Sequence, residues 1–260
     1  MTTRLDYARQ ATGYDETRRA SPSIVRPLLA ALDEAPGTTL LDVGGGTGNY
    51  AAALRGRGFA PTVVDVAPAM LARARAKDLR VVRGDATALP FSSGSVDAVL
   101  MVSMLHLVPR WHRALAEARR VLRPGGRLAL MVYAREHLRV HWVLAYFPRS
   151  HAWVWPEHQT LAELGRELPA ARVLPFEFTD LEDGSLAAMC RRPHLLLDPA
   201  CRARTSFFER LAAGDPDELT AGLQRLARDF MRGRRPDVEV AGARVRYGDG
   251  AVIAWTKPVA

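Results

Sequence analysis

The sequence predicts an α/β protein built on a doubly wound, mostly parallel sheet. Three observations carry this prediction: strand-length apolar runs recur through the first half, helix-length segments separate them, and glycines directly follow the first run. The runs are apolar without alternation, as in strands that are covered on both faces. Parallel strands need crossovers of helix length, so this order of elements predicts a parallel sheet with helices on both sides.

The predicted elements of the first half alternate along the chain. Strands are expected at 39–45, 61–66, 79–84, 96–102 and 127–133, and helices at 69–77 and 111–122. In the second helix, apolar residues from Trp111 to Leu122 recur at helical spacing, and the Pro-Gly-Gly at 124–126 ends it.

The second half is expected to complete the sheet and to add helices to it. Expected elements are a tryptophan- and histidine-rich segment without strand pattern at 137–158, a helix at 161–168, a strand at 171–178 and a last strand at 251–257. A helical insertion precedes the last strand. In it, Asp215 caps a helix with Pro216 at the first position, and Glu218 completes a capping box.

Composition excludes several classes of protein. The chain has 260 residues, 48% of them hydrophobic, which is typical of a globular domain. Its apolar runs are too short for a membrane helix and its N-terminus has no apolar signal core, so the cytoplasm is the expected compartment. The net charge is +8, but the basic residues, nearly all arginine, are scattered and do not indicate a nucleic-acid surface. Two cysteines are too few for a disulfide framework.

A glycine-rich turn and two carboxylates predict a nucleoside site. The glycines at 44, 46 and 48 open a helix after the first strand, where backbone N–H groups favour an anionic ligand. Their spacing differs from the dinucleotide fingerprint, and no Gly-Lys-Ser or Gly-Lys-Thr of a P-loop follows. Asp65 ends the second strand, where it can accept both ribose hydroxyls. Asp85 ends the third and can accept the adenine amine, with the Ala86 N–H toward a ring nitrogen.

Five stretches that include these residues resemble, in order, the motifs of the class I S-adenosylmethionine-dependent methyltransferases. They are LLDVGGGTGNY, VVDVAPAML, GDATALPF and SVDAVLMVSMLHLV followed by ARRVLRPGGRLAL, and they span about residues 38–134. The resemblance implies a seven-stranded Rossmann-like sheet and S-adenosylmethionine as methyl donor, with S-adenosylhomocysteine as product. It also implies three parts: a helical lid at 1–36, a cofactor-binding half at 37–135, and cap helices with the last strands at 136–260.

The resemblance also implies a set of cofactor contacts. The methionine part is expected at Asp42 and the loop of Gly44, Gly45, Gly46 and Gly48, the ribose at Asp65, and the adenine at Asp85 and Ala86. Further expected contacts are Val66, Met70 and Ser103, with core packing as the alternative for the first two. The segment YDETRR (14–19) is similar to lid segments that cover the cofactor in the family, which adds Tyr14 and either Arg18 or Arg19 as partner of the methionyl carboxylate. Tyr7 belongs to the same lid.

The candidate for acid–base chemistry is His106, which follows the fourth strand at the ligand-bearing edge of the sheet. A structural hydrogen bond is the alternative role. The acceptor is expected between His106 and an aromatic stretch of the cap, with Trp142, Tyr146, Trp153 and Trp155 as contacts. No histidine and carboxylate cluster at metal-binding spacing is present in the sequence, so no metal is expected.

A small-molecule acceptor is favoured over macromolecules. The loop of amino-group methyltransferases and the nucleophilic Pro-Cys of cytosine enzymes are absent from the sequence, which disfavours nucleic acid. RNA or protein methylation, or a cofactor-binding relative with a regulatory role, stay open as alternatives. A nicotinamide oxidoreductase is disfavoured by the glycine spacing. A monomer or homodimer without membrane attachment is expected.

Overall fold

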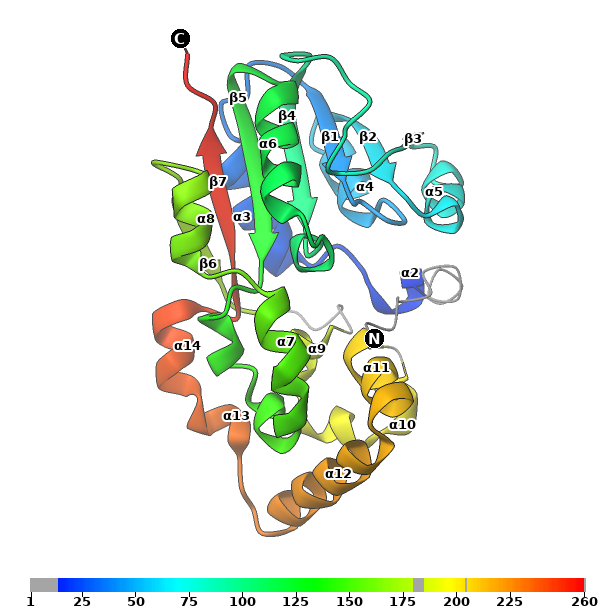
Figure 1. The fold of residues 1–260 in the computed structure, drawn as a ribbon, viewed down its shortest axis with the longest axis vertical. Coiled ribbons are helices and arrows are strands. Elements are labelled where there is room, and N and C mark those ends of the chain that lie inside the picture. Colours follow the sequence, from blue (N-terminus) through cyan, green and yellow to red (C-terminus); the bar gives the residue numbers. More distant parts are fainter. Residues whose placement is uncertain (1–13, 180–184, 204, 260) are drawn as a thin grey trace.

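A computed structural model describes residues 14–179, 185–203 and 205–259. Its sheet has seven strands in the order β3-β2-β1-β4-β5-β7-β6 (Figure 1). They are β1 (Thr39–Val43), β2 (Ala60–Asp65), β3 (Arg80–Arg83), β4 (Val96–Val102), β5 (Leu122–Val132), β6 (Arg172–Phe176) and β7 (Gly250–Thr256). Only β7 runs antiparallel to its neighbours, β5 and β6. The predicted doubly wound, mostly parallel sheet is confirmed.

Helices cover both faces of the sheet. On one face lie α3 (Pro22–Leu32) and α4 (Asn49–Arg55), and on the other α6 (Trp111–Val121) and α8 (Leu161–Glu167). Alternate side chains of β5 serve the two layers: Leu128 and Leu130 pack with α6, and Met131 packs with α3. The remaining helix of this half, α5 (Pro68–Arg75), packs beside β2 and β3.

One of the helices that cover the sheet, α3, lies inside the segment that was expected to be a lid. Within residues 1–36, Ile24, Leu28 and Leu32 of α3 are buried against β5 and β7. The apolar stripe of this helix makes it part of the core, so the expected lid role is wrong for α3. Residues 1–13, which include Tyr7, lie outside the described part of the chain.

The strand β5 begins earlier than the sequence indicated. The chain passes from α6 directly into β5 at Leu122, which pairs with Val96 beyond a register shift. On the N-terminal side of Arg127, Gly125 and Gly126 extend the antiparallel pairing of β5 with the chain after β7. The Gly125 N–H donates to the Lys257 carbonyl oxygen, and the Lys257 N–H donates to the Gly126 carbonyl oxygen. Neighbouring strands therefore extend β5 through a Pro-Gly-Gly sequence that by itself predicts only a turn.

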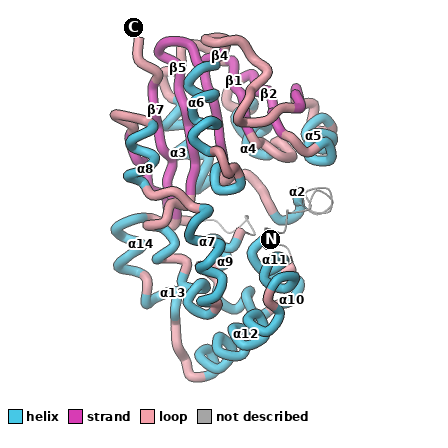
Figure 2. The backbone as a smooth tube through the Cα atoms, in the orientation of Figure 1, coloured by secondary structure: helices cyan, strands magenta, loops and turns pink. Residues whose placement is uncertain are grey.

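The insertions form a helical cap with a core of its own (Figure 2). Its elements before β6 are η2 (His137–Arg139), η3 (Trp142–Tyr146), η4 (Pro148–Ser150) and α7 (His151–Glu157). Those between β6 and β7 are α9 (Leu186–Met189), η5 (Pro193–Leu197), α10 (Pro199–Arg202), α11 (Ser206–Gly214), α12 (Pro216–Met231), α13 (Pro236–Glu239) and α14 (Ala241–Tyr247). Phe147 is fully buried at the centre, with its ring 5.8 Å from Phe207 and 5.5 Å from Phe208.

The start of α12 confirms one sequence prediction and corrects another. Asp215 caps the helix, because its Oδ1 accepts a hydrogen bond of 3.1 Å from the Glu218 N–H. The capping box is wrong, since the buried Glu218 carboxylate accepts instead from the Arg149 N–H, 2.9 Å away. A tertiary contact between cap segments has replaced the local one. Among the described residues, no helix has the length and apolar character that crossing a membrane requires.

Candidate active site

The turn after β1 requires glycine at several positions. Gly44, Gly46 and Gly48 have positive φ angles of 67°, 55° and 75°, a conformation that side chains disfavour. A Cβ on Gly45 would lie 2.5 Å from the Asp42 carboxylate. The loop is held in place by Asp65, whose Oδ2 accepts from the Gly46 N–H at 2.9 Å. At these glycines a ligand can therefore approach the backbone without meeting a Cβ.

Asp42 is a buried carboxylate that has no hydrogen-bond partner among the described residues. The residue is 1% exposed. Burial, with the neighbouring Asp65 charge, raises the pKa of Asp42 to about 7, and the nearby Ala51 N–H offsets only part of this shift. Leaving such a group unpaired is costly, so the site is suited to a ligand that brings a cationic or donor group. The ammonium of S-adenosylmethionine fits this requirement.

Asp65 and Asp85 stand at adjacent strand ends, as predicted. Each oxygen of Asp65 accepts one backbone N–H, from Gly46 and from Ala67, both at 2.9 Å. Since a carboxylate oxygen has two acceptor positions, each retains one for a ribose hydroxyl. The Asp85 Oδ1 is used by Thr87, 2.8 Å from both its N–H and its hydroxyl. These bonds lower the pKa of Asp85, whereas its Oδ2 has no partner within the described residues.

The other expected cofactor contacts differ in exposure. Val66, directly after β2, is 55% exposed, which leaves it accessible to a ligand. Met70 and Ala86 are buried. The Met70 sulfur lies 4.0 Å from the position of a Gly46 Cβ, so Met70 supports the glycine loop from below. Ser103 follows β4 with a φ of 49°, a strained conformation for serine.

His106 lies just beyond Ser103 at the same edge, in η1 (Leu105–Leu107). Its half-buried ring stacks on His158, with ring centroids 4.9 Å apart and planes 11° apart. Burial and the neighbouring His158 lower the pKa of His106 to about 3. The imidazole is therefore neutral at physiological pH and holds a proton only weakly, which favours hydrogen bonding over proton abstraction.

The segment YDETRR lies beside the glycine loop. Its helix α2 (Tyr14–Thr17) is anchored by Asp15, which accepts from the Thr47 hydroxyl and forms an ion pair of 2.8 Å with Lys77. The Lys77 Nζ also donates to the Thr47 carbonyl oxygen at 2.9 Å. The carbonyl oxygen of Arg18 accepts a hydrogen bond from the Asn49 side chain. The segment that carries Tyr14, Arg18 and Arg19 therefore lies at the edge of the sheet where the cofactor is expected. Sequence reasoning missed Asp15 and Lys77.

The four aromatic residues expected around the acceptor have different partners in the cap. Trp142 and Tyr146 are buried within the cap, where the indole N–H donates to the Cys190 carbonyl oxygen and the phenol to Asp229, each at 2.8 Å. They border a cavity of about 500 Å³. This cavity is also lined by five arginines: Arg139, Arg225, Arg228, Arg232 and Arg234.

The other two aromatic residues also have partners in the cap. Trp153 packs on Phe207 beneath the Arg210 guanidinium, which is 4.0 Å from the ring centroid. Trp155 is 39% exposed and stacks on His151. These contacts occupy the four side chains within the cap, and their role at the acceptor stays a prediction. Trp155, on the segment that leads to His158, stays a candidate contact.

The strand order, the glycine turn after β1 and the carboxylates after β2 and β3 define a nucleoside-binding protein of Rossmann-like topology. A family model described as "Methyltransferase domain" matches residues 41–130. A ubiquinone/menaquinone biosynthesis C-methyltransferase of Acidiphilium cryptum is 34% identical over 182 residues, covering 64% of this chain and 70% of that protein. The chain belongs to the class I S-adenosylmethionine-dependent methyltransferases.

Other relatives match over shorter stretches or through the fold alone. A demethylmenaquinone methyltransferase of Beutenbergia cavernae is 40% identical over 111 residues, 42% of this chain and 46% of that protein. Several curated relatives are thus matched over only about half of their length. A solved structure from Anabaena variabilis, titled a candidate methyltransferase from an antibiotic biosynthesis pathway, has a TM-score of 0.69 with 23% identity. It covers 93% of this chain and 97% of its own, which shows the shared fold.

The unpaired Asp42 carboxylate predicts pH-dependent cofactor binding. With its pKa raised to about 7, Asp42 is largely protonated at pH 6 and must ionise to pair with the methionyl ammonium. Affinity for S-adenosylhomocysteine is expected to rise about tenfold between pH 6 and 8. Calorimetry at several pH values measures this, with Asp42→Asn as a variant whose weaker binding has lost the pH dependence. Equal wild-type affinities at pH 6 and 8 would contradict the role of Asp42.

The contact between Lys77 and Asp15 predicts that Lys77 helps to hold α2 in place. Lys77→Met removes three bonds that join Asp15, Thr47 and Asn49. Amide exchange at 14–18 is expected to become faster by about tenfold, since the one of these bonds that reaches α2, from Lys77 to Asp15, joins two charged groups and contributes roughly 1.5 kcal/mol. Arg57→Met, on the exposed turn after α4, is the control. Unchanged exchange in Lys77→Met would mean that α2 is held by other contacts.

Proposed function

We propose that the chain transfers the methyl group of S-adenosylmethionine to a small-molecule acceptor of the quinone class. The observation that carries the proposal is the buried Asp42 carboxylate, which has no hydrogen-bond partner among the described residues and lies beside the glycine-rich loop. This arrangement suits a cationic amino acid group. The neighbouring Asp65 retains acceptor positions for a ribose, which fits a ligand that joins methionine to adenosine.

Residues of the chain would hold the cofactor at three points. Asp42 and the loop from Gly44 to Gly48 would bind its methionine part, Asp65 its ribose, and Asp85 with the Ala86 N–H its adenine. Tyr14 and Arg18 or Arg19 would cover the ligand from α2 and the residues after it. The bound cofactor supplies a sulfonium methyl group that needs no covalent nucleophile from the protein. The residues must therefore align the acceptor with it and exclude water.

The acceptor would lie between η1 and the cap. The names of the Beutenbergia and Acidiphilium relatives specify quinone substrates, and a quinone ring is flat, apolar and bordered by oxygens. His106 would meet one of those oxygens. Trp155 of α7 would supply apolar area from the cap. These names favour a small molecule over RNA or protein, and nothing in the described residues points to a regulatory relative. The expected compartment stays the cytoplasm.

A panel of acceptors tests the proposal. The full chain is incubated with methyl-labelled S-adenosylmethionine and, separately, a reduced short-chain demethylmenaquinone, a total RNA fraction and a mixture of unmodified proteins. Label is expected in the quinol alone. Label in RNA or protein and none in the quinol would overturn the acceptor class. Calorimetry with NAD in place of S-adenosylhomocysteine is the control for the cofactor, and NAD is expected not to bind.

A further inference from the structure

Two imidazole rings from distant parts of the chain meet at the junction of sheet and cap. His106 follows β4, whereas His158 lies in the loop between α7 and α8. Their rings are nearly parallel, 11° apart, with centroids separated by 4.9 Å. Both residues are half-buried. The cap thus places a second titratable side chain directly against the one expected to act on the acceptor.

The orientation of the His158 ring is set by its own segment. Its Nδ1 lies 2.8 Å from the Val154 carbonyl oxygen. A carbonyl oxygen only accepts, so Nδ1 carries the hydrogen and Nε2 is left with its lone pair. Neither the His158 Nε2 nor either ring nitrogen of His106 has a hydrogen-bond partner among the described residues. Three nitrogens of the stacked pair are therefore available to a ligand.

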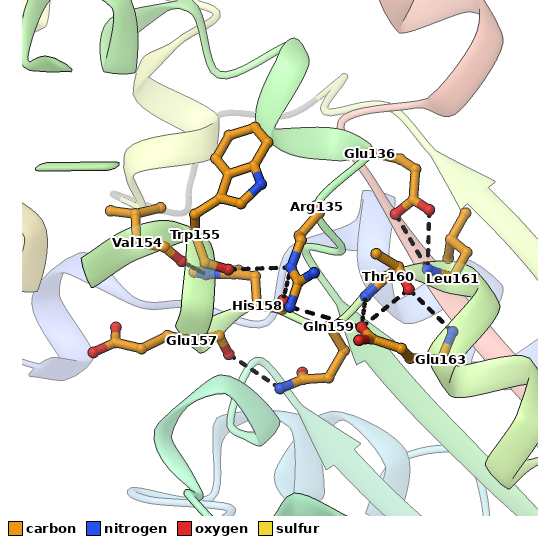
Figure 3. Close-up of polar contacts among 10 residues, drawn as sticks. All are labelled: Arg135, Glu136, Val154, Trp155, Glu157, His158, Gln159, Thr160, Leu161 and Glu163. Carbon is orange, nitrogen blue, oxygen red and sulfur yellow. Dashed lines mark hydrogen bonds and ion pairs between the residues drawn. The ribbon is translucent and has the colours of Figure 1, made fainter. Parts of the chain in front are cut away.

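Arg135, just beyond β5, fixes the backbone of this segment (Figure 3). Its Nε donates to the carbonyl oxygens of Trp155, at 3.1 Å, and His158, at 2.6 Å. Its backbone N–H donates to the Gln159 carbonyl oxygen at 2.9 Å. Figure 3 shows the guanidinium between the end of α7 and the side chain of Glu163. The sheet thereby holds the loop that carries His158 at a defined position.

The charges around the pair keep it neutral. Burial, together with the repulsion that a protonated His158 would exert, lowers the pKa of His106 to about 3. Burial also lowers the pKa of His158, assisted by Arg135 and offset in part by the Val154 carbonyl and Glu157. His141, the other histidine that faces His158, has its pKa lowered to about 3 by burial. A neutral pair does not repel a cationic sulfonium, as an imidazolium would.

We propose that His158 is a second acceptor-binding residue, which together with His106 forms a neutral imidazole clamp for the oxygen of the methyl acceptor. The inference rests on the proposed function. A neutral imidazole has one N–H donor and one lone pair, so the clamp offers one donor and two acceptors. It can accept a hydrogen bond from a hydroxyl and donate one to the same oxygen. The preferred acceptor is an uncharged phenol or quinol, methylated at or next to that oxygen. The new bond to the methyl group forms as the sulfonium carbon–sulfur bond breaks, S-adenosylhomocysteine leaves, and the proton displaced from the acceptor is released to solvent.

Variants that separate ring from nitrogen test the clamp. His158→Phe keeps the aromatic stack and removes both nitrogens, whereas His158→Asn keeps a donor toward Val154 and removes the ring. With a short-chain demethylmenaquinol, we expect both variants to lower kcat/KM for the acceptor about tenfold, the scale of one hydrogen bond, with the KM for S-adenosylmethionine unchanged. His151→Phe, an exposed histidine of α7 stacked on Trp155, is the matched control and should behave as wild type.

The outcomes distinguish this inference from the proposed function. An active wild type with an equally active His158→Phe would overturn the clamp and leave methyl transfer intact. An inactive wild type would overturn the proposed function, and the clamp with it. A second measurement does not depend on any variant: nitrogen-15 NMR of the histidines should show His158 protonated at Nδ1 alone from about pH 5.5 to 8. A titration of His158 near the ordinary histidine pKa would overturn the clamp.

Discussion

Asp65→Ala is expected to weaken S-adenosylmethionine binding by about 1.5 to 3 kcal/mol, or roughly tenfold to a hundredfold. The variant loses the acceptors of the ribose diol. It also releases the N–H groups of Gly46 and Ala67, both of which now donate to this carboxylate at 2.9 Å. The glycine loop and the ribose site therefore lose their common support. Calorimetry with S-adenosylhomocysteine measures the change.

Two further variants make the Asp65 result specific. Asp65→Asn retains one acceptor oxygen and should bind with intermediate affinity. Asp33→Ala, an exposed aspartate after α3, should bind as wild type. Wild-type affinity in Asp65→Ala would remove the ribose assignment. The heat of unfolding of each variant shows whether the sheet has stayed intact.

Gly222→Ala is expected to destabilise the cap by about 1 to 3 kcal/mol, the usual range for overpacking a core. Gly222 is a buried residue of α12, and a Cβ at this position would lie 2.6 Å from the Tyr146 carbonyl oxygen and would also strike the Phe147 ring. Phe147 is fully buried among other aromatic rings, so it has no room to move aside. The helix would have to shift away from η3.

A glycine in open space is the control for this prediction. A Cβ added to Gly242 of α14 would meet no atom within 4 Å, so Gly242→Ala should be neutral or stabilise by up to about 1 kcal/mol through helix propensity. Urea unfolding followed by tryptophan fluorescence compares the two, since Trp142 and Trp153 report on the cap. Equal stability of Gly222→Ala and wild type would contradict the packing of α12 on η3.

The central part of the sheet was predictable because strands such as β1 and β4 are apolar on both faces and are followed by helices of crossover length. The Pro-Gly-Gly part of β5 was not, because its pairing with Lys257 joins segments far apart in the sequence. The α3 helix was assigned to a lid since its amphipathic pattern shows a buried face without showing what covers it. The Glu218 contact with Arg149 likewise depends on tertiary structure.

The candidate site divides in the same way. Asp42, Asp65 and Asp85 were predictable, because residues at the ends of adjacent parallel strands must meet at one edge. The orientation of Trp142 and Trp153 depends on packing between distant cap segments, which periodicity does not reveal. Lys77 could have been singled out from the sequence, since it is one of only two lysines in an arginine-rich chain. His158 carried none beyond being a histidine near Trp155.

Transfer of a labelled methyl group tests the central claim most directly. The full chain is incubated with S-adenosylmethionine carrying a deuterated methyl group and with a reduced short-chain demethylmenaquinone, and both products are measured by mass spectrometry. We expect the deuterated methyl group on the quinol, with one S-adenosylhomocysteine formed for each methyl transferred. Cofactor binding without any labelled quinol would contradict the proposed reaction, and absence of cofactor binding would contradict the site itself.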